Sequence, residues 1–187
     1  MPFREKAHLM TDSEIDRTLV HLSHDIIDKT GVIENLVFIG VLRRGVFLAE
    51  RLAQKISQKV GTKVPVGSLD VERYRDDRPD SGSARRSHEP QIPFPITGTD
   101  VVLVDDVLFT GRTTRAALDA LFDHGRPRRV RLCVLIDRGH RELPIEAGFV
   151  GKKLDTDPVD VIEVKLCEED EIEKVLILEK VETESAS

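Results

Sequence analysis

The 187-residue sequence has only two cysteines, Cys133 and Cys167, which lie far apart with no C-x-x-C spacing. That scarcity argues against a disulfide framework or a cysteine-rich metal site, and predicts a reduced, cytoplasmic protein with incidental thiols. No apolar run approaches the roughly 20 residues that cross a bilayer. The first residues, MPFREKAHLMTDSE, show no secretory pattern. We therefore expect no membrane partner.

The sequence also has fewer basic than acidic residues: 28 Lys and Arg against 34 Asp and Glu, which gives a formal net charge of −6. The deficit argues against non-specific nucleic-acid binding, but a local basic patch on an acidic protein stays compatible with it. Basic residues cluster in GRPRRVR (125–131) and DRGHR (137–141), whereas acidic residues concentrate in 167–185.

Neither an internal repeat nor a domain linker interrupts the chain, and its length suits a single domain, 1–187. Apolar periodicity of 3.6 predicts helices over 11–29, 46–60 and 113–125, the first opened by a capping box from Thr11 to Glu14. Short apolar runs predict strands over 34–41, 64–71, 100–106 and 128–138, with one or two more between 147 and 167. Alternating strands and helices predict an α/β fold, a mostly parallel sheet with helices on both faces. The last 45 or so residues are expected to add a smaller irregular unit.

The stretch from Arg75 to about Pro93, RDDRPDSGSARRSHEPQIP, is polar, aperiodic and rich in Pro, Gly and Ser. A structureless loop of this length is uncommon inside a compact domain and is often a mobile lid. We therefore expect a lid over about 75–92.

The segment VVLVDDVLFTGRTTR (101–115) carries most of the functional signal. In an open parallel sheet, ligands bind beyond the carboxyl ends of the strands, where Asp105 and Asp106 emerge. In the TGRTT turn that follows, Gly111 permits close approach of a ligand to the backbone. The free amides at the start of the next helix, together with the helix dipole, favour an anion. The three threonine hydroxyls of the turn add donors, so a phosphate fits here.

The two carboxylates need a different partner, because an anion beside them would be repelled. Sugar hydroxyls can donate hydrogen bonds to them, and Mg²⁺ would reinforce that arrangement. A ribose 5-phosphate carries both groups at this spacing. The alternative is a strand-end charge pair followed by a threonine-capped helix. The other phosphate motifs do not compete: Val46 and Phe47 stand where a P-loop needs Lys and Ser or Thr, and no G-x-G-x-x-G occurs.

VVLVDDVLFTGRTT resembles the phosphoribosyl pyrophosphate (PRPP) motif of type I phosphoribosyltransferases. ERYRDD, LIDRGHRELPI and FVGKK resemble further signatures of one subgroup, the PyrR family. Its members are pyrimidine-operon attenuation regulators that are also uracil phosphoribosyltransferases. The resemblance runs from about residue 9 to 180. It implies the type I fold, with a small hood over about 137–160 plus the C-terminal strands.

The resemblance implies that Asp105 and Asp106 hold the ribose hydroxyls, with Mg²⁺ accompanying PRPP, and that the following turn holds the 5-phosphate. The implied PRPP-binding residues are Val104, Asp105, Asp106, Val107, Leu108, Phe109, Thr110, Gly111, Arg112, Thr113 and Thr114. The catalytic residues predicted on this basis are Asp105, Asp106 and Arg75.

The resemblance also implies a pyrophosphate loop with a non-proline cis peptide, formed by Leu42, Arg43, Arg44 and Gly45. An exposed basic turn is the alternative for this loop. The implied lid residues are Tyr74, Arg75, Asp76, Asp77, Arg85 and Arg86. Solvated loop charge is the alternative for the last two arginines.

The base pocket is expected under the hood, with Asp137, Arg138, Phe149 and Val150 as candidates. Relatives that salvage purines carry an acid where Phe109 stands, so the resemblance favours uracil over 6-oxopurines. We expect no general base, because positioning and charge stabilisation would supply most of the rate.

The rival hypothesis is an RNA-binding attenuator whose nucleotide site is only a sensor for UMP or UTP. In the family, a basic dimer face binds a hairpin in pyrimidine-operon leader mRNA, and a homodimer or higher homo-oligomer is implied. The RNA-binding candidates are Arg17, His21, His24, Lys29, Arg141, Lys152 and Lys153. This chain departs from the pattern at Val20, His21, Glu146 and 155–157, each change removing positive charge or a polar donor. A solvated helix face is the alternative for residues 21–24.

Overall fold

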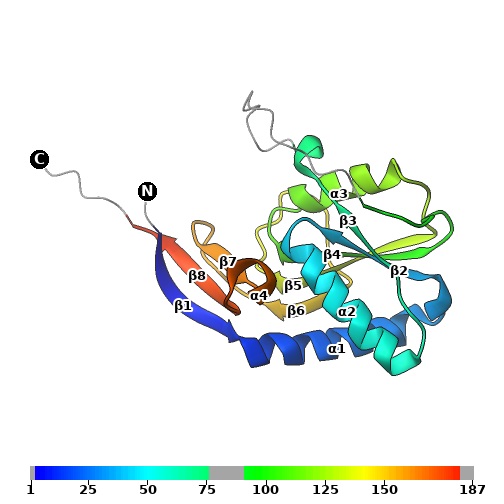
Figure 1. Ribbon diagram of the computed structural model, residues 1–187. Coiled ribbons are helices and arrows are strands. Elements are labelled where there is room, and N and C mark those ends of the chain that lie inside the picture. The colour runs from blue at the N-terminus through cyan, green and yellow to red at the C-terminus, as the bar shows by residue number, and fades with distance from the viewer. Residues whose placement is uncertain (1–2, 76–90, 182–187) are drawn as a thin grey trace, which may run out of the picture.

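The computed structural model describes residues 3–75 and 91–181, which form two sheets with helices packed around them (Figure 1). The larger sheet has five strands in the order β3-β2-β4-β5-β6, and all its pairings are parallel. These strands are β2 (Leu36–Val41), β3 (Val66–Leu69), β4 (Asp100–Leu108), β5 (Arg129–Asp137) and β6 (Phe149–Lys153). The predicted α/β class with a mostly parallel sheet is confirmed.

Three helices cover the larger sheet. The helices α1 (Asp12–Thr30) and α2 (Arg44–Val60) contribute to one apolar cluster, whereas α3 (Arg112–Phe122) contributes to the other. The predicted capping box is present: the Thr11 hydroxyl accepts from the Glu14 amide, and the Glu14 carboxylate accepts from the Thr11 amide at 2.8 Å. Two short 3-10 helices, η1 (Ile33–Asn35) and η2 (Glu72–Tyr74), precede β2 and follow β3.

The smaller sheet is antiparallel, in the order β1-β8-β7, and stands beside the main body (Figure 1). Its strands are β1 (Phe3–Thr11), β7 (Val161–Lys165) and β8 (Lys174–Lys180), with the short helix α4 (Cys167–Asp170) between the last two. The C-terminal segment is not irregular as expected, because the N-terminal strand pairs with β8 to complete a three-stranded antiparallel sheet, with register shifts at Glu5/Ala7 and His8/Met10. Strand β1 was not predicted, and most of its residues are exposed.

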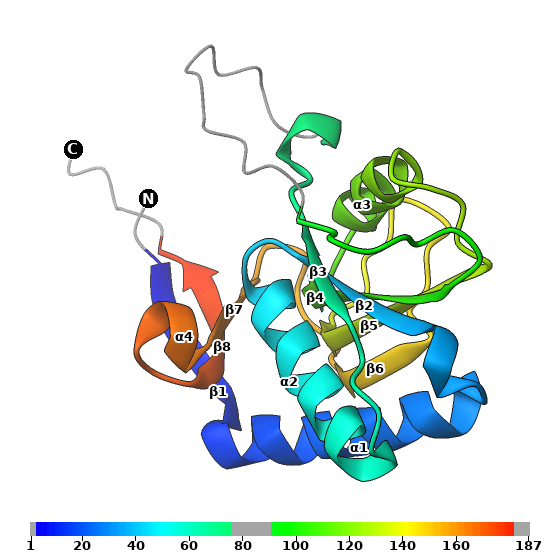
Figure 2. The same ribbon diagram turned by 45° about the vertical axis from the view of Figure 1, so that its right-hand side comes forward.

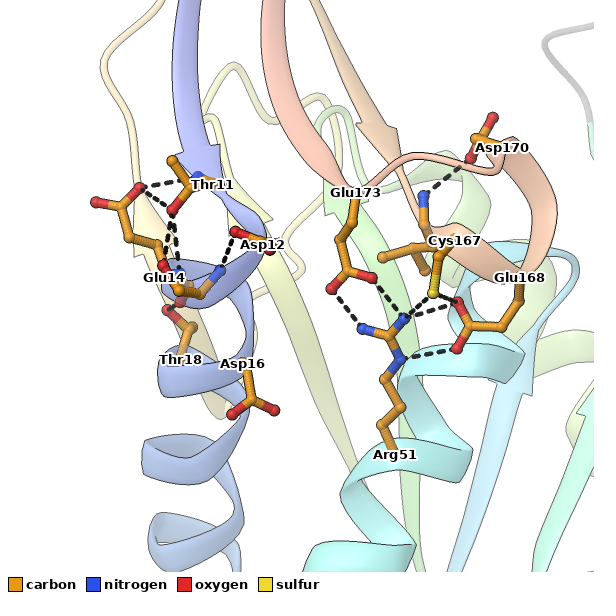
Figure 3. Close-up of polar contacts among 12 residues, drawn as sticks. Thr11, Asp12, Glu14, Asp16, Thr18, Arg51, Cys167, Glu168, Asp170 and Glu173 are labelled. Atoms are coloured by element: carbon orange, nitrogen blue, oxygen red, sulfur yellow. Dashed lines mark hydrogen bonds and ion pairs between the residues drawn. The ribbon is translucent and has the colours of Figure 1, made fainter.

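The Arg51 guanidinium ties the smaller sheet to α2 (Figure 3). It donates to the Glu173 carboxylate at 2.7 Å through Nη1 and to Glu168 at 2.8 Å through Nε, and Nη2 lies 3.3 Å from the Cys167 sulfur. Both sheets also share one apolar cluster with α1 and α2. The hairpin that carries α4 is therefore anchored close to the start of α2.

Among the helices of the described residues, we find none with the length and apolar character that crossing a membrane requires.

Candidate nucleotide site

A pocket of about 220 Å³ opens at the carboxyl end of β4, where the phosphate loop was predicted. The segment that joins β4 to α3 forms most of its wall. The lining residues are Arg75, Val107, Leu108, Phe109, Thr110, Gly111, Arg112, Thr113, Thr114 and Glu142. The structure thus brings the predicted turn, the residue after η2 and one residue of the β5–β6 loop around a single cavity.

The start of α3 has the geometry of an anion site. Gly111 has a φ of +92°, which favours glycine, and its carbonyl accepts the Arg115 amide as the helix begins. The N-cap residue, Gly111, has no side chain to cap this end, and the Arg112 amide donates to the Thr110 hydroxyl at 3.3 Å. The next amides of the first turn have no partner within the helix. Thr114 is buried, and Arg112 Nε donates to the Glu142 carboxylate at 2.6 Å. A phosphate at this helix start would receive the amides and the helix dipole.

Asp105 and Asp106 follow one another at the end of β4. Asp105 is buried and Asp106 half-buried, and the Asp106 amide donates to Asp105 Oδ1 at 2.9 Å. Burial raises the pKa of both carboxyls, and the negative charge of Asp106 raises the pKa of Asp105 further. The Arg75 charge opposes the shift at Asp105. Ionisation of both carboxyls is therefore unfavourable on its own, and hydroxyl donors or a cation would stabilise the ionised pair.

The predicted pyrophosphate loop packs directly against this acid pair. The Leu42–Arg43 peptide is cis, as the family resemblance implied. A Cβ placed on Gly45 would lie 2.4 Å from the Val104 carbonyl oxygen and 3.2 Å from the Asp105 Cα, so only glycine fits at this contact. The start of α2 and the end of β4 consequently touch backbone to backbone.

Both arginines of this loop form ion pairs with α4. Arg44 donates to the Asp170 carboxylate through Nη2 at 2.7 Å and through Nε at 3.2 Å, whereas Arg43 Nη1 donates to Glu169 at 2.7 Å. The Arg44 charge also lowers the pKa of Asp106, against the larger effect of burial. Arg44 is thus held between α4 and the acid pair, and the alternative of a free basic turn does not describe it.

We expect the Asp170→Asn substitution to raise the KM for PRPP about threefold to tenfold with little change in kcat, because one lost charge-assisted contact weakens binding by that order. Asp170 accepts from Arg44 twice and from the Leu166 amide at 2.9 Å, so an amide there cannot keep Arg44 in place. Steady-state kinetics with PRPP varied measure the effect.

Glu169→Gln is the matched control for that experiment. Its partner Arg43 has a side chain that is 65% exposed, and such surface pairs contribute little. We expect its KM to stay within about twofold of wild type. Equal KM values for both variants would show that Asp170 does not hold Arg44 for the substrate.

The residues just before the predicted lid lie against α3 (Figure 2). The Tyr74 hydroxyl donates to the Asp123 carboxylate at 2.5 Å, and Arg75 lines the pocket. The other predicted lid residues, Asp76, Asp77, Arg85 and Arg86, lie outside the described residues.

The four base-pocket candidates do not lie together. Asp137 ends β5 and Arg138 follows it at the carboxyl end of the sheet, whereas Val150 is half-buried in the cluster on the α3 face. Phe149 is 2% exposed and packs in the cluster beneath α1, with Lys29 Nζ 5.4 Å from its ring centroid. The structure does not bring Phe149 to the other three candidates: as the first residue of β6 it pairs with Cys133 in the middle of β5, whereas Lys153 pairs with Asp137.

His140 and Thr156, for which no role was predicted, lie close to Phe109 and Arg138 beside the pocket. The Phe109 ring contacts the His140 ring edge-on at 6.1 Å, and the Arg138 Cζ lies 4.1 Å from the Phe109 centroid. His140 Nε2 lies 2.6 Å from the Thr156 carbonyl oxygen. Within the described part of the chain, Arg138 Nε and Thr156 Oγ1 are buried without a hydrogen-bond partner. The DRGHR cluster was the sequence signal for this group, but the segment around Thr156 gave none.

Six of the seven RNA-binding candidates lie on α1 and β6, which are in contact. Their side chains are exposed, and the set comprises Arg17, His21, His24, Lys29, Lys152 and Lys153. Val20 is half-buried, and Glu146 and Asp155 are exposed. Arg141 differs from the other six because it is half-buried, and its guanidinium donates to the Ile145 and Phe109 carbonyls and to the Asp137 carboxylate.

The chain resembles known proteins over most of its length. Residues 12–169 match the family model described as "Phosphoribosyl transferase domain". The "Bifunctional protein PyrR" of Chloroflexus aurantiacus is 52% identical over 93% of this chain and 95% of that protein. The protein of the same name from Thermus aquaticus is 50% identical over 95% and 98%.

Solved structures share the fold at much lower identity. A Trypanosoma cruzi hypoxanthine phosphoribosyl transferase superposes with a TM-score of 0.71 at 20% identity, covering 93% of this chain and 91% of that one. A hypoxanthine phosphoribosyltransferase from Staphylococcus aureus gives a TM-score of 0.66 at 20% identity, with 92% of each chain covered.

Proposed function

The chain belongs to the PyrR family of phosphoribosyltransferases, and we propose that it transfers ribose 5-phosphate from PRPP to uracil, releasing UMP and pyrophosphate. The observation that carries the proposal is the acid pair, Asp105 and Asp106, set directly before a glycine-initiated helix whose start lines one pocket. A ribose and its 5-phosphate match these two features in order and in charge.

Each part of PRPP has a partner of suitable chemistry. The 5-phosphate would take the amides and hydroxyls of Thr110–Thr114, and the ribose hydroxyls would donate to Asp105 and Asp106. The leaving diphosphate would meet the loop 42–45, where Arg44 already faces the acid pair. Positioning the sugar between a fixed phosphate and a fixed diphosphate supports direct attack by a uracil nitrogen at the ribose carbon.

Magnesium fits this donor set, because the two carboxylates offer the oxygen ligands that Mg²⁺ prefers. Bound with PRPP, the ion would neutralise diphosphate charge and relieve the repulsion that raises the pKa of Asp105. Among the described residues, the one group with metal-ligand spacing is Cys167, Glu168 and Glu173, and the Arg51 guanidinium fills it. That group is therefore no candidate for the ion.

The base would lie near Phe109, Arg138 and His140. The aromatic ring at 109 offers an apolar contact and no proton, which supports a pyrimidine that needs no acid partner. No general base is invoked, and fixed charges would stabilise the transition state.

The decisive measurement is pyrophosphate release from PRPP and Mg²⁺ with uracil, hypoxanthine, guanine or orotate as acceptor. We expect turnover with uracil and kcat/KM at least about 100-fold lower for the other bases, as a polar pocket rejects a wrong base by that order. Faster turnover with a purine would overturn the substrate assignment. Binding of UMP without turnover by any base would leave the chain a nucleotide sensor.

We further infer that the exposed basic residues of α1 and β6 bind an RNA hairpin when a uridine nucleotide occupies the site. Their exposure and the contact between the two elements support a continuous face. Binding of a pyrimidine-operon leader hairpin should weaken steeply between low and high salt, because phosphate contacts release counterions. A flat salt dependence would refute RNA binding by this face.

We also propose that the protein acts in the cytoplasm as a homodimer or higher homo-oligomer. Light scattering would measure the oligomeric state.

A further inference from the structure

Arg141 lies in the loop after β5 and has one of the densest hydrogen-bond sets of the described residues. Its Nη1 donates to the Phe109 carbonyl at 2.9 Å and to the Gly139 carbonyl at 3.2 Å. Its Nε donates to the Ile145 carbonyl at 2.9 Å, and its Nη2 donates to the Asp137 carboxylate at 2.7 Å. One guanidinium thus joins the end of β5, both ends of its own loop, and the segment after β4.

Backbone hydrogen bonds also join the loop 138–145 to residues 108–112, and we call this set of contacts the seam. The Arg138 amide donates to the Leu108 carbonyl at 3.1 Å, and the Glu142 and Leu143 amides donate to the Thr110 carbonyl at 2.9 and 3.2 Å. The Arg112–Glu142 ion pair closes the pocket end. The loop 138–145 is therefore bonded to residues 108–112 through residues 138 and 141–143, and Arg141 is the side chain at the centre.

The two loops serve different parts of the nucleotide. Residues 110–114 form the phosphate turn, whereas Arg138 and His140 lie beside Phe109, where the base would bind. We propose that Arg141 is a positioning residue, which holds the phosphate turn and the base-side loop as one rigid unit. This role of Arg141 rests on the proposed nucleotide site. It adds the residue that sets the distance between the phosphate turn and the base-side loop.

The same contacts bear on two predicted roles. Asp137 Oδ1 accepts from Arg141 and from the Gly139 amide at 3.0 Å, so this oxygen of the predicted base-binding residue is engaged within the loop. The Arg141 side chain, predicted to bind RNA, is 21% exposed and donates to acceptors of the protein itself. An arginine is required because its planar fork reaches acceptors on several sides, whereas a lysine is a single point charge.

The test compares Arg141→Met and Arg141→Lys with the wild type, and Arg129→Met, an exposed arginine at the far end of β5, serves as the matched control. Hydrogen exchange, followed by mass spectrometry without ligand, should show the amides of Glu142 and Leu143 exchanging at least about tenfold faster in both Arg141 variants. Calorimetry should show UMP binding weakened at least about tenfold, and kinetics should show KM for PRPP and for uracil rising together. The salt dependence of RNA binding should keep its wild-type slope.

Three results would overturn the proposal. Unchanged exchange of the two amides would show that the seam does not depend on Arg141. A lower melting temperature with unchanged UMP affinity and KM values would reduce Arg141 to a purely structural residue. A shallower salt slope would return it to the RNA face. Because the exchange readout needs no substrate, absence of turnover in the wild type would contradict the proposed enzyme without affecting this test.

Discussion

Asp105→Asn is expected to lower uracil-dependent turnover at least about 100-fold and to raise the melting temperature of the protein. The loss follows because an amide cannot receive the ribose hydroxyls and Mg²⁺ as a carboxylate does. The gain follows because Asp105 is buried beside Asp106, and burial together with that charge raises its pKa. Asparagine keeps an acceptor for the Asp106 amide but removes the buried charge. We therefore expect the variant to be more stable than wild type at neutral pH.

The pH dependence gives the same experiment a second readout. A carboxyl whose folded pKa is raised above its ordinary value of 3.8 holds a proton in the folded state that the unfolded state has lost. Stability from this group is therefore present at low pH and is lost as pH rises from that value through the raised pKa. The variant should lack this decline, so its advantage in melting temperature should grow with pH across that window.

Thermal melts from pH 4 to pH 8, with turnover measured on the same samples, check both statements. Asp119→Asn is the matched control, since that carboxylate is exposed and pairs with Arg115 on the surface of α3. It should change neither turnover nor the pH profile appreciably. An Asp105→Asn variant that is less stable than wild type at neutral pH would contradict the strained acid pair.

The part of the site that could be predicted from sequence is the part whose contacts are local. Ten consecutive positions, 105–114, contain Asp105, Asp106, Gly111 and the threonine turn. The sequence pattern therefore predicts the strand end, the glycine turn and the helix start. The parallel sheet was predictable for a similar reason, because each buried strand is a short apolar run between turn signals.

The remaining site contacts depend on pairings that sequence patterns do not encode. The Arg43–Glu169 and Arg44–Asp170 bonds each join residues 126 positions apart, and β1 pairs with β8 across nearly the whole chain. Phe149 was a base-pocket candidate because of the FVGKK resemblance, and only strand register shows that it lies in the core opposite Cys133. The inward turn of Arg141 depends on loop geometry, so its charge alone suggested RNA.

Gly45→Ala is the second change for which we expect a large effect, namely a destabilisation of about 2–4 kcal/mol, as overpacking of a tight core contact gives. The added methyl would lie 2.4 Å from the Val104 carbonyl oxygen and 3.2 Å from the Asp105 Cα. Both are backbone atoms of a central strand, so neither moves aside cheaply. The start of α2 must move instead, and with it the loop 42–45 that faces the acid pair.

The loss of activity should exceed the loss expected from unfolding alone, because movement of α2 separates the loop 42–45 from Asp105 and Asp106. We expect kcat/KM for PRPP to drop at least about 100-fold under conditions where the variant is still folded, since misplacement by about 1 Å has effects of that order. Urea unfolding and steady-state kinetics at low temperature measure the two effects separately. Gly148→Ala is the control, because its added methyl would meet nothing nearer than the Leu132 carbonyl oxygen at 3.8 Å. A Gly45→Ala variant that is destabilised but keeps its wild-type kcat/KM would show that catalysis does not require the contact between the loop 42–45 and β4.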